Sequence, residues 1–349
     1  MFRQIVISKD TMTYFKDKGV EFLSLNKTLK LAIQTLDDDI PWERFCIECK
    51  TVRSPGGRRL RVDDEVYAFL KGIKERFSQN DVKITFSRAA HILLKTAYEN
   101  DRLRAVSVNV QGYKAKPSVL DKRLRELTKM MNEELPDLIF LQEMRVGEDL
   151  YRLNDLKKRL KIDYEAILPK GFDVDTEYDF CSCVTLIRKS LADKVKMHSI
   201  ERNHNDTGDS KLRVNYFTVN GMTYINAWMF QTYGASEARK ELAGQMWDKI
   251  MEEIRKNVGV DTEFYLVGDL NAGEGVAFED RIEELESRMV NTKLSVERKI
   301  PTRGGSVLDH AYCSKFANRV RTVDTTVWDT YGLSDHKALI MRLGRRKAA

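Results

Sequence analysis

The pattern of apolar and polar residues changes near residue 101. Before this point, apolar residues recur mainly at the three- and four-residue spacing of helices, with two short runs that are typical of strands. After it, short strand-like runs recur between helical patterns such as Leu120–Glu134 and Ser236–Lys256. We therefore expect a small, mostly helical N-terminal domain over residues 1–100, followed by a larger α/β domain over residues 101–349.

One order of elements occurs twice in the first region. The strand-like runs are Phe2–Ser8 and Arg58–Val62, and the helical patterns that follow them are Lys9–Lys18 with Ser24–Leu36, and Asp63–Phe77 with Ser87–Tyr98. Strand, helix, helix in tandem resembles the ribbon-helix-helix fold, a dimer whose paired strands lie in the DNA major groove. Alternation places Arg59 and Arg61 on one face of the second strand, and the resemblance implies that they contact DNA.

This resemblance leaves the assembly open. Two repeats in one chain would form the paired ribbon internally, which makes a monomer sufficient, whereas pairing between chains would give a homodimer. The alternative interpretation of the first region is a small helical accessory domain that packs on the larger one.

In the second region, a series of apolar runs ends in acids, amides, an indole or histidine. They are Asn109 and Gln111 in NVQG, Glu143 in LQE, Trp228 in INAW, Asp269 and Asn271 in GDLN, Asp309 in LDH, and Asp335 and His336 in SDH. Any one of these is typical of an ordinary strand end and turn. The whole series is not, because unrelated loops have no reason to place these residue types in this order.

The ordered set resembles the endonuclease/exonuclease/phosphatase superfamily over Leu103–Arg345. The resemblance implies an α/β fold of four layers, in which two packed, mostly antiparallel sheets are flanked by helices. It also implies that the motif residues meet at one end of the sheets. The expected activity is metal-dependent hydrolysis of a phosphodiester.

The chemistry of that reaction explains the residue types. A phosphodiester is anionic and repels hydroxide, so its hydrolysis needs charge neutralisation, an oriented water and help for the leaving oxygen. Carboxylate and amide oxygens suit a hard cation. The resemblance assigns Glu143, Asp335 and, through a bound water, Gln111 to Mg²⁺ or Mn²⁺.

The resemblance assigns catalysis to five further residues. Asp269 would orient or deprotonate the attacking water, while Asn271 and Asn109 would donate amide hydrogen bonds to phosphate oxygens. His336 is the catalytic histidine by its place in SDH. Asp309 would hold the tautomer of His336 and favour its charged form, so that the imidazolium contacts the scissile phosphate.

Three positions leave alternatives open. Gln111 stands where many nucleases of the superfamily have Asp or Asn, and its neutral amide predicts weaker metal binding. Trp228 stands where relatives have His or Tyr, and it is either a DNA-stacking residue or a core aromatic. Arg145, two residues after Glu143, either contacts a neighbouring phosphate or forms a surface salt bridge.

Composition indicates the setting. Five cysteines in 349 residues suggest free thiols in a reducing compartment. No apolar run approaches the roughly 18 residues that span a bilayer, and the first residues show no hydrophobic signal core. We expect a cytoplasmic, intracellular protein with no membrane partner. The net charge of +6 permits a polyanionic partner without requiring one.

These observations favour a Mg²⁺-dependent DNA endonuclease, a nickase that its N-terminal domain directs to DNA. Two alternatives stay open. The first is a phosphoesterase of the same fold that acts on RNA or small phosphate esters, because the core motifs are shared across the superfamily. The second is a catalytically impaired DNA-binding regulator, which Gln111 and Trp228 keep open and the retained His336 and Asp269 oppose.

Overall fold

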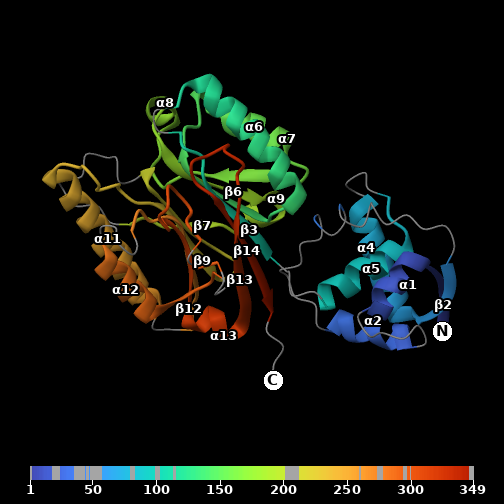
Figure 1. Ribbon diagram of the computed structural model, residues 1–349. Coiled ribbons are helices and arrows are strands. Elements are labelled where there is room, and N and C mark those ends of the chain that lie inside the picture. The colour runs from blue at the N-terminus through green and yellow to red at the C-terminus, as the bar shows by residue number, and fades with distance from the viewer. Residues whose placement is uncertain are drawn as a thin grey trace. The chain divides into compact units, whose positions relative to one another are not determined.

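The chain divides into two compact units, Met1–Leu103 and Arg104–Ala349, each of which is described by itself (Figure 1). The computed structural model describes residues 2–17, 24–34, 44, 47, 57–78, 83–98, 103–112, 115–200, 212–258, 261–272, 278–293, 297–298 and 300–345.

In the N-terminal unit, strand, helix, helix occurs twice, as the sequence predicts. Its elements are β1 (Phe2–Ser8), α1 (Lys9–Asp17), α2 (Leu25–Gln34), β2 (Gly57–Asp63), α4 (Asp64–Ser78) and α5 (Phe86–Tyr98). The strands β1 and β2 pair antiparallel within the chain, with Ile5 opposite Leu60. The inward side chains of this ribbon join those of the helices in a single hydrophobic core, and each buried aliphatic side chain contributes roughly 1.5–3 kcal/mol by leaving water.

The ends of the two strands are bound in matching ways. The backbone N–H of Ser8, at the end of β1, donates to Ser87 Oγ at 2.9 Å. The backbone N–H of Asp63, at the end of β2, donates to Asn26 Oδ1 at 3.2 Å. Ser87 and Asn26 are each the second residue of a helix, α5 and α2. Each strand is thus anchored by the second helix of the other repeat, which gives this unit an internal pseudo-twofold arrangement.

The second unit contains two six-stranded sheets. In the order of their pairing, the first sheet consists of β13 (Arg321–Trp328), β14 (Ala338–Arg345), β3 (Leu103–Asn109), β4 (Leu138–Met144), β6 (Ser182–Arg188) and β5 (Tyr164–Ile167). The second consists of β11 (Met289–Asn291), β12 (Asp309–Ser314), β10 (Glu263–Asp269), β9 (Met222–Trp228), β8 (Val214–Val219) and β7 (Lys196–Met197). Two neighbouring pairs, β3 with β4 and β9 with β10, are parallel.

Helices cover the outer faces of the two sheets (Figure 1). They are α6 (Pro117–Glu134), α7 (Tyr151–Arg159), α8 (Val174–Glu177), α9 (Lys189–Ala192), α11 (Glu237–Val258), α12 (Glu279–Arg288) and α13 (Lys315–Val320). Among the described residues, no helix has the length and hydrophobicity that crossing a membrane requires. The predicted four-layer α/β sandwich is confirmed.

The two sheets pack face to face through a buried polar contact as well as apolar side chains. Gln142 of β4 donates through Nε2 to Asn226 Oδ1 of β9 at 2.7 Å. Asn226 in turn donates through Nδ2 to the Val184 carbonyl of β6 at 3.2 Å. Both amides are fully buried, so leaving either unpaired would cost about 1–3 kcal/mol. This contact fixes how the strand ends that carry the site lie against each other.

Candidate active site

Strand ends from both sheets bring the motif residues together. Asn109 is the last residue of β3, Asp269 is the last residue of β10, and Asp309 is the first residue of β12. The antiparallel pairing of β10 with β12 sets Asp269 directly opposite Asp309. Directly opposed residues point to the same face of a sheet, so this register alone places two carboxylates side by side.

Asn109 joins the two sheets at this point. Its Nδ2 donates to Glu143 Oε1 at 3.0 Å and to Asp269 Oδ2 at 2.9 Å. Its Oδ1 accepts the backbone N–H of Gln111 at 2.8 Å. The amide is completely buried, and its two donor contacts hold Glu143 and Asp269 close together.

His336 is held by Asp309. Its Nδ1 lies 2.8 Å from Asp309 Oδ2, and the imidazole is 1% exposed. Ser334 fixes the loop, because its hydroxyl donates to the Asn109 carbonyl at 2.7 Å and accepts the His336 N–H at 3.1 Å. The ring therefore has a set orientation, with Nδ1 bound and Nε2 turned toward the other carboxylates.

The other nitrogen of His336 has no hydrogen-bond partner in the described structure, although it is buried. Nε2 lies 3.8 Å from Asp269 Oδ2 and 3.9 Å from Asp335 Oδ1, both beyond hydrogen-bond distance. A buried imidazole nitrogen left without a partner is costly unless a ligand completes it. It marks the position at which a substrate oxygen would be contacted.

Burial and charge shift the pKa values of this pair. Burial lowers the pKa of His336, but the charge of Asp309, the hydrogen bond to it and the charge of Asp269 outweigh burial and raise the pKa above its ordinary value. Burial, with the charges of Asp309 and Glu143, raises the pKa of Asp269, although His336 opposes the shift. An imidazolium thus lies beside a carboxylate that is unusually ready to accept a proton, which suits acid–base chemistry near neutral pH.

The backbone is strained at three of these positions. Gln111, Glu143 and Asn271 have φ values of 53°, 53° and 47°, in the left-handed region that residues other than glycine rarely adopt. Glu143 lies at a register shift between β4 and β6, and such a bulge re-aims a side chain. Strain of this kind persists only where the surroundings enforce it, and it is concentrated at functional sites.

Two glycines of the motifs are required by close approach. A Cβ on Gly112 would lie 2.0 Å from the Glu143 carbonyl oxygen. A Cβ on Gly268, which has φ of 139°, would lie 2.0 Å from the Ala227 carbonyl oxygen. Both contacts are impossible for any other residue, so the glycines of NVQG and GDLN allow the strand ends to come together.

The same residues fit a bound cation. Asp269, Asp309 and His336 offer ligand atoms that lie within 4.8 Å of one another, and all three are buried. Glu143 is tied to this group through Asn109. A charged His336 has no free nitrogen for a metal, so the carboxylate oxygens of Glu143, Asp269 and Asp309 are the groups that would suit a divalent cation.

The family model for the Endonuclease/Exonuclease/phosphatase family matches residues 106–336. The chain belongs to this family. Enzymes of the family are metal-dependent phosphoesterases and nucleases, and the matched segment contains every motif residue of the site. A sequence comparison with curated proteins finds no match.

Solved structures of the family share the fold of the second unit. Truncated TDP2 from Caenorhabditis elegans matches with a TM-score of 0.50 and 18% identity over 69% of this chain and 97% of that one. The AP endonuclease LMAP from Leishmania major matches with a TM-score of 0.51 and 15% identity over 70% and 88%. An endonuclease/exonuclease/phosphatase from Bacteroides vulgatus matches with a TM-score of 0.50 and 16% identity over 70% and 99%.

The residues predicted to bind metal do not all lie together. Glu143 belongs to the buried acidic group. Asp335, with its side chain 33% exposed, instead accepts a hydrogen bond from Arg303 Nε at 2.9 Å. Gln111 contributes backbone contacts, accepting from Arg123 at 2.9 Å through its carbonyl. One oxygen of Asp335 is thus bound to Arg303, and the other lies 3.9 Å from His336 Nε2 at the edge of the buried group.

Two residues that were predicted to contact DNA, Trp228 and Arg145, contact other protein groups instead. The Trp228 side chain is 6% exposed, and the Arg213 guanidinium lies 3.7 Å from its ring centroid. This burial favours the core role of Trp228 and leaves no support for base stacking. Arg145 donates to the Ala115 carbonyl and lies 3.6 Å from Asp179, so the structure favours its ion-pair role.

One residue that positions the site, Thr302, is not apparent from the sequence. Thr302 Oγ1 accepts the backbone N–H groups of Leu308 and Asp309, each at 3.0 Å, and so positions the start of β12. No motif includes Thr302. Ser334, by contrast, is the first residue of SDH, and its place in that motif was the available indication of its role.

A cleft opens beside the motif residues. It has a volume of about 890 Å³, and Asn271 and Leu308 form part of its wall. The Asn271 Nδ2 donates to the Met229 carbonyl at 2.9 Å, which fixes the amide at the edge of the cleft. The other lining residues include two cations and two aromatic residues: Lys240, Arg303, Tyr233 and Phe278.

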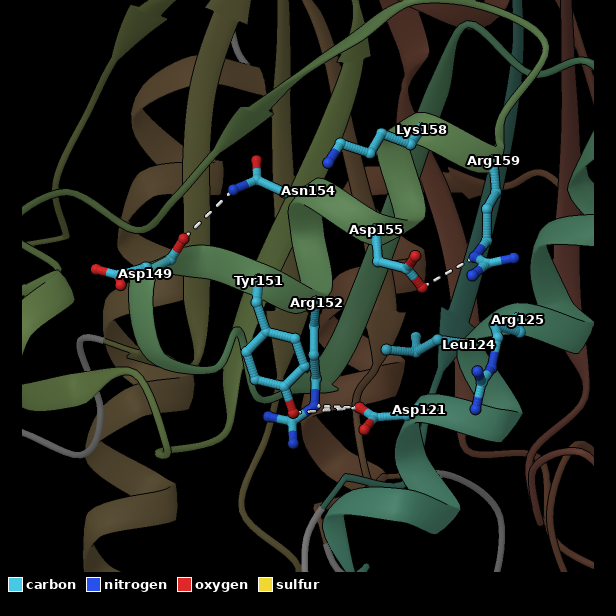
Figure 2. Close-up of a pocket in the computed structure, with 10 residues that line it drawn as sticks. All are labelled: Asp121, Leu124, Arg125, Asp149, Tyr151, Arg152, Asn154, Asp155, Lys158 and Arg159. Carbon is cyan, nitrogen blue, oxygen red and sulfur yellow. Dashed lines mark hydrogen bonds and ion pairs between the residues drawn. The ribbon is translucent and has the colours of Figure 1, made fainter.

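A second hollow, of about 510 Å³, lies between α6 and α7 (Figure 2). Its side chains bind one another: Arg152 donates to Asp121 at 2.7 Å, and Arg159 donates to Asp155 at 2.9 Å. None of the motif residues lines it. This hollow is therefore separate from the candidate active site.

Proposed function

We propose that this chain is a divalent-metal-dependent endonuclease that nicks DNA. The observation that supports the proposal most strongly is the arrangement of His336, whose bound Nδ1 and unpartnered, buried Nε2 leave one nitrogen for a substrate oxygen. This arrangement lies beside a cleft that contains cationic and aromatic side chains. Together they suit a polyanionic substrate with stacking bases.

In the proposed mechanism, Asp269 orients the attacking water and accepts its proton. The raised pKa of Asp269 favours this role. His336 in its charged form donates a hydrogen bond to an oxygen of the scissile phosphate, and Asp309 stabilises that charge. Asn109 keeps Asp269 in place, and Asn271 lies at the edge of the cleft where phosphate oxygens would be contacted.

Glu143, with Asp269 and Asp309 nearby, would hold the cation, which we propose to be Mg²⁺ or Mn²⁺. When bound, the cation supplies charge neutralisation for the phosphate and the leaving oxygen. The catalytically impaired alternative loses support. Trp228 is a packed core residue, and Gln111 contributes through its backbone, so neither departure from the family pattern removes a contact among the described residues of the site.

We further propose that the N-terminal unit is a tandem ribbon-helix-helix domain that binds DNA. Its support is the antiparallel pairing of β1 with β2 and the exposure of Arg59 and Arg61 on that ribbon. Because the two strands pair within one chain, a monomer is sufficient for the ribbon.

The experiment is relaxation of supercoiled plasmid by the full chain. We expect open circles with Mg²⁺, no cleavage with EDTA, and a loss of at least about 100-fold in rate for His336→Ala, because a preorganised donor to a transition-state oxygen contributes about 10²–10³-fold. His198→Ala is the matched control. His198 Nε2 lies 2.8 Å from Thr218 Oγ1, outside the site, and its loss is expected to leave the rate unchanged.

Other outcomes would redirect the proposal. Intact plasmid with cleavage of RNA or of small phosphate esters would replace DNA as the substrate. Relaxation that persists in His336→Ala would contradict the catalytic assignment. If the wild-type chain hydrolyses none of these substrates, the proposal that it is an enzyme would be contradicted.

A further inference from the structure

The outer face of the β1–β2 ribbon is exposed and is chemically uneven. Ile5 and Leu60 face the core, and the alternate residues face outward. Two outward residues on β1 are Gln4 and Val6, the latter 56% exposed. The corresponding outward residues on β2 are Arg59 and Arg61.

The pseudo-twofold arrangement shows which outward positions are equivalent. Ile5 in β1 and Leu60 in β2 are the first buried residues of identical burial patterns along the two strands. Counting from these two residues, Gln4 is equivalent to Arg59 and Val6 is equivalent to Arg61. Since the strand ends are anchored alike through Ser87 and Asn26, the two halves share a backbone arrangement and differ in their side chains.

The pairing register then distributes these side chains unevenly over the ribbon. Gln4 lies opposite Arg61, and Val6 lies opposite Arg59. The Arg61 guanidinium lies 5.3 Å from the ring centroid of Phe2, which helps to hold it over the ribbon. Two cations therefore project from one strand, and an amide and an aliphatic side chain project from the other.

Charge and shape indicate the occupant of this face. Among the described outward residues, the one acid, Asp63, lies at the end of the ribbon and is ion-paired with Lys30. The face is thus positive, and a two-stranded ribbon fits the major groove of DNA. The deep, narrow major groove of duplex RNA does not admit side chains in this way.

The side chains differ in the bases that they suit. Arginine donates two hydrogen bonds to guanine, glutamine pairs with adenine, and an aliphatic group contacts the thymine methyl. We propose that the ribbon binds a DNA site without twofold symmetry, in which Arg59 and Arg61 contact guanine and Gln4 and Val6 contact an A·T pair. This inference rests on the proposed DNA function of the chain.

A DNA site without twofold symmetry would affect which strand is cleaved. The catalytic unit belongs to the same chain as the ribbon, and there is one such unit for each pair of repeats. A ribbon that binds in only one orientation is therefore expected to favour cleavage of one strand of the duplex. A symmetric ribbon would bind equally well in both orientations and would expose both strands to cleavage.

Selection from a pool of random DNA duplexes tests the inference. The full chain is used in EDTA, so that binding is measured without cleavage. The expected selected site is not palindromic and is bound at least about tenfold more tightly than an unrelated duplex, in line with the discrimination of a bidentate arginine–guanine contact. The same sequence as duplex RNA is expected to compete poorly.

Two exchanged variants make the test specific. Q4R/V6R gives both halves arginine, and R59Q/R61V gives both halves glutamine and valine. Each is expected to select a palindrome, the first rich in G·C and the second rich in A·T. Lys71→Ala removes an exposed charge of α4 that is ion-paired with Glu75 and is expected to leave the selected site unchanged.

The outcomes separate this inference from the proposed function. A palindromic site for the wild-type chain, or the same site for all variants, would overturn the asymmetry. Equal competition by duplex RNA would contradict binding of the ribbon in the major groove of DNA. Plasmid nicking with no selected sequence would overturn the inference and leave the endonuclease intact. A circular dichroism melt of each variant confirms that it is folded.

Discussion

The two units of this chain place their polar side chains in opposite environments. In the second unit, Asn109, Asp269 and His336 are each at most 1% exposed, and contacts between distant segments such as Asn109 to Asp269 and His336 to Asp309 hold them together. In the N-terminal unit, Arg59 and Arg61 project into solvent from a ribbon whose other face forms the core. Buried groups acquire shifted pKa values and fixed geometry, whereas exposed groups keep ordinary chemistry and remain accessible to a partner.

The two units therefore suit different parts of the proposed reaction. Catalysis needs preorganised groups in a site of low dielectric, and the second unit supplies them. Recognition of a long polyanion needs accessible cations on a surface of matching shape, which the ribbon would supply under the proposed function. We therefore expect substitutions in the second unit to change the rate of cleavage, and substitutions on the ribbon to change its position.

The largest effect is expected for Asp309→Asn. This change removes the charge that stabilises the His336 imidazolium while keeping the size of the side chain. The turnover number should fall by about 10²–10⁴-fold, and DNA binding in EDTA should be unchanged. Single-turnover cleavage and fluorescence anisotropy measure the two quantities, with Asp179→Asn, which removes the exposed partner of Arg145, as the control. An equal loss of binding would contradict the proposal that catalysis and DNA binding belong to different units.

A second effect concerns stability in acid. Burial, with the charge of Lys293, lowers the pKa of His310 from 6.5 to about 4, while its Nε2 is bound to the Ala272 carbonyl at 2.9 Å. Since the folded pKa is lowered, neutral His310 stabilises the fold above pH 6.5, and this stability is lost as the pH falls toward 4. The expected loss is about 3 kcal/mol.

Denaturant unfolding in EDTA measures this loss. Tryptophan fluorescence follows mainly the second unit, which contains three of the four tryptophans: Trp228, Trp247 and Trp328. His310→Gln cannot titrate in this range, so its free energy of unfolding should depend less on pH between 6.5 and 4. Identical pH dependence in the wild-type chain and the variant would contradict the assignment.

A third effect concerns the metal. Glu143→Gln keeps the shape of the side chain but removes a negative charge from the buried group. We expect the Mg²⁺ concentration for half-maximal cleavage to rise by about 10–100-fold, as for other changes at metal sites. Glu283→Gln, on the exposed face of α12, is the matched control. Unchanged metal dependence would remove Glu143 from the proposed cation site.

The smallest effect is expected in the cleft. Lys240→Met removes one cation from the cleft wall, where a phosphate contact would be lost. The Michaelis constant should rise a few fold, and the logarithmic salt dependence of binding should become shallower by about one unit. Lys256→Met, on the same helix and paired with Glu252, should change neither quantity. Equal effects of the two changes would show that the cleft has no special contact with the substrate.

Much of this site could be predicted from the sequence because its residues lie at strand ends. GDLN and LDH place Asp269 and Asp309 next to apolar runs, and pairing of those runs then sets the two acids opposite each other. The exposed face of the ribbon could be predicted for a similar reason, since alternation alone separates Arg59 and Arg61 from the buried Leu60. Local patterns suffice where strand periodicity decides the direction of a side chain.

The remainder depended on contacts between distant segments. The bond from Gln142 to Asn226 links two sheets, and the bond from Arg303 to Asp335 binds one oxygen of a predicted metal ligand. Neither pair has a local pattern that reveals it. The burial of Trp228 under Arg213 is of the same kind, because a tryptophan at a strand end is compatible with both a core and a surface position.

The division of labour between the two units is tested most directly by mapping nicks at nucleotide resolution. One plasmid is cleaved with Mg²⁺ by the wild-type chain and by the Arg59→Ala, Arg61→Ala double variant, to the same total extent. We predict that wild-type nicks gather at a few related sequences and on one strand, and that nicks by the variant spread over both strands at a similar total rate. Identical maps for the two proteins would contradict the account.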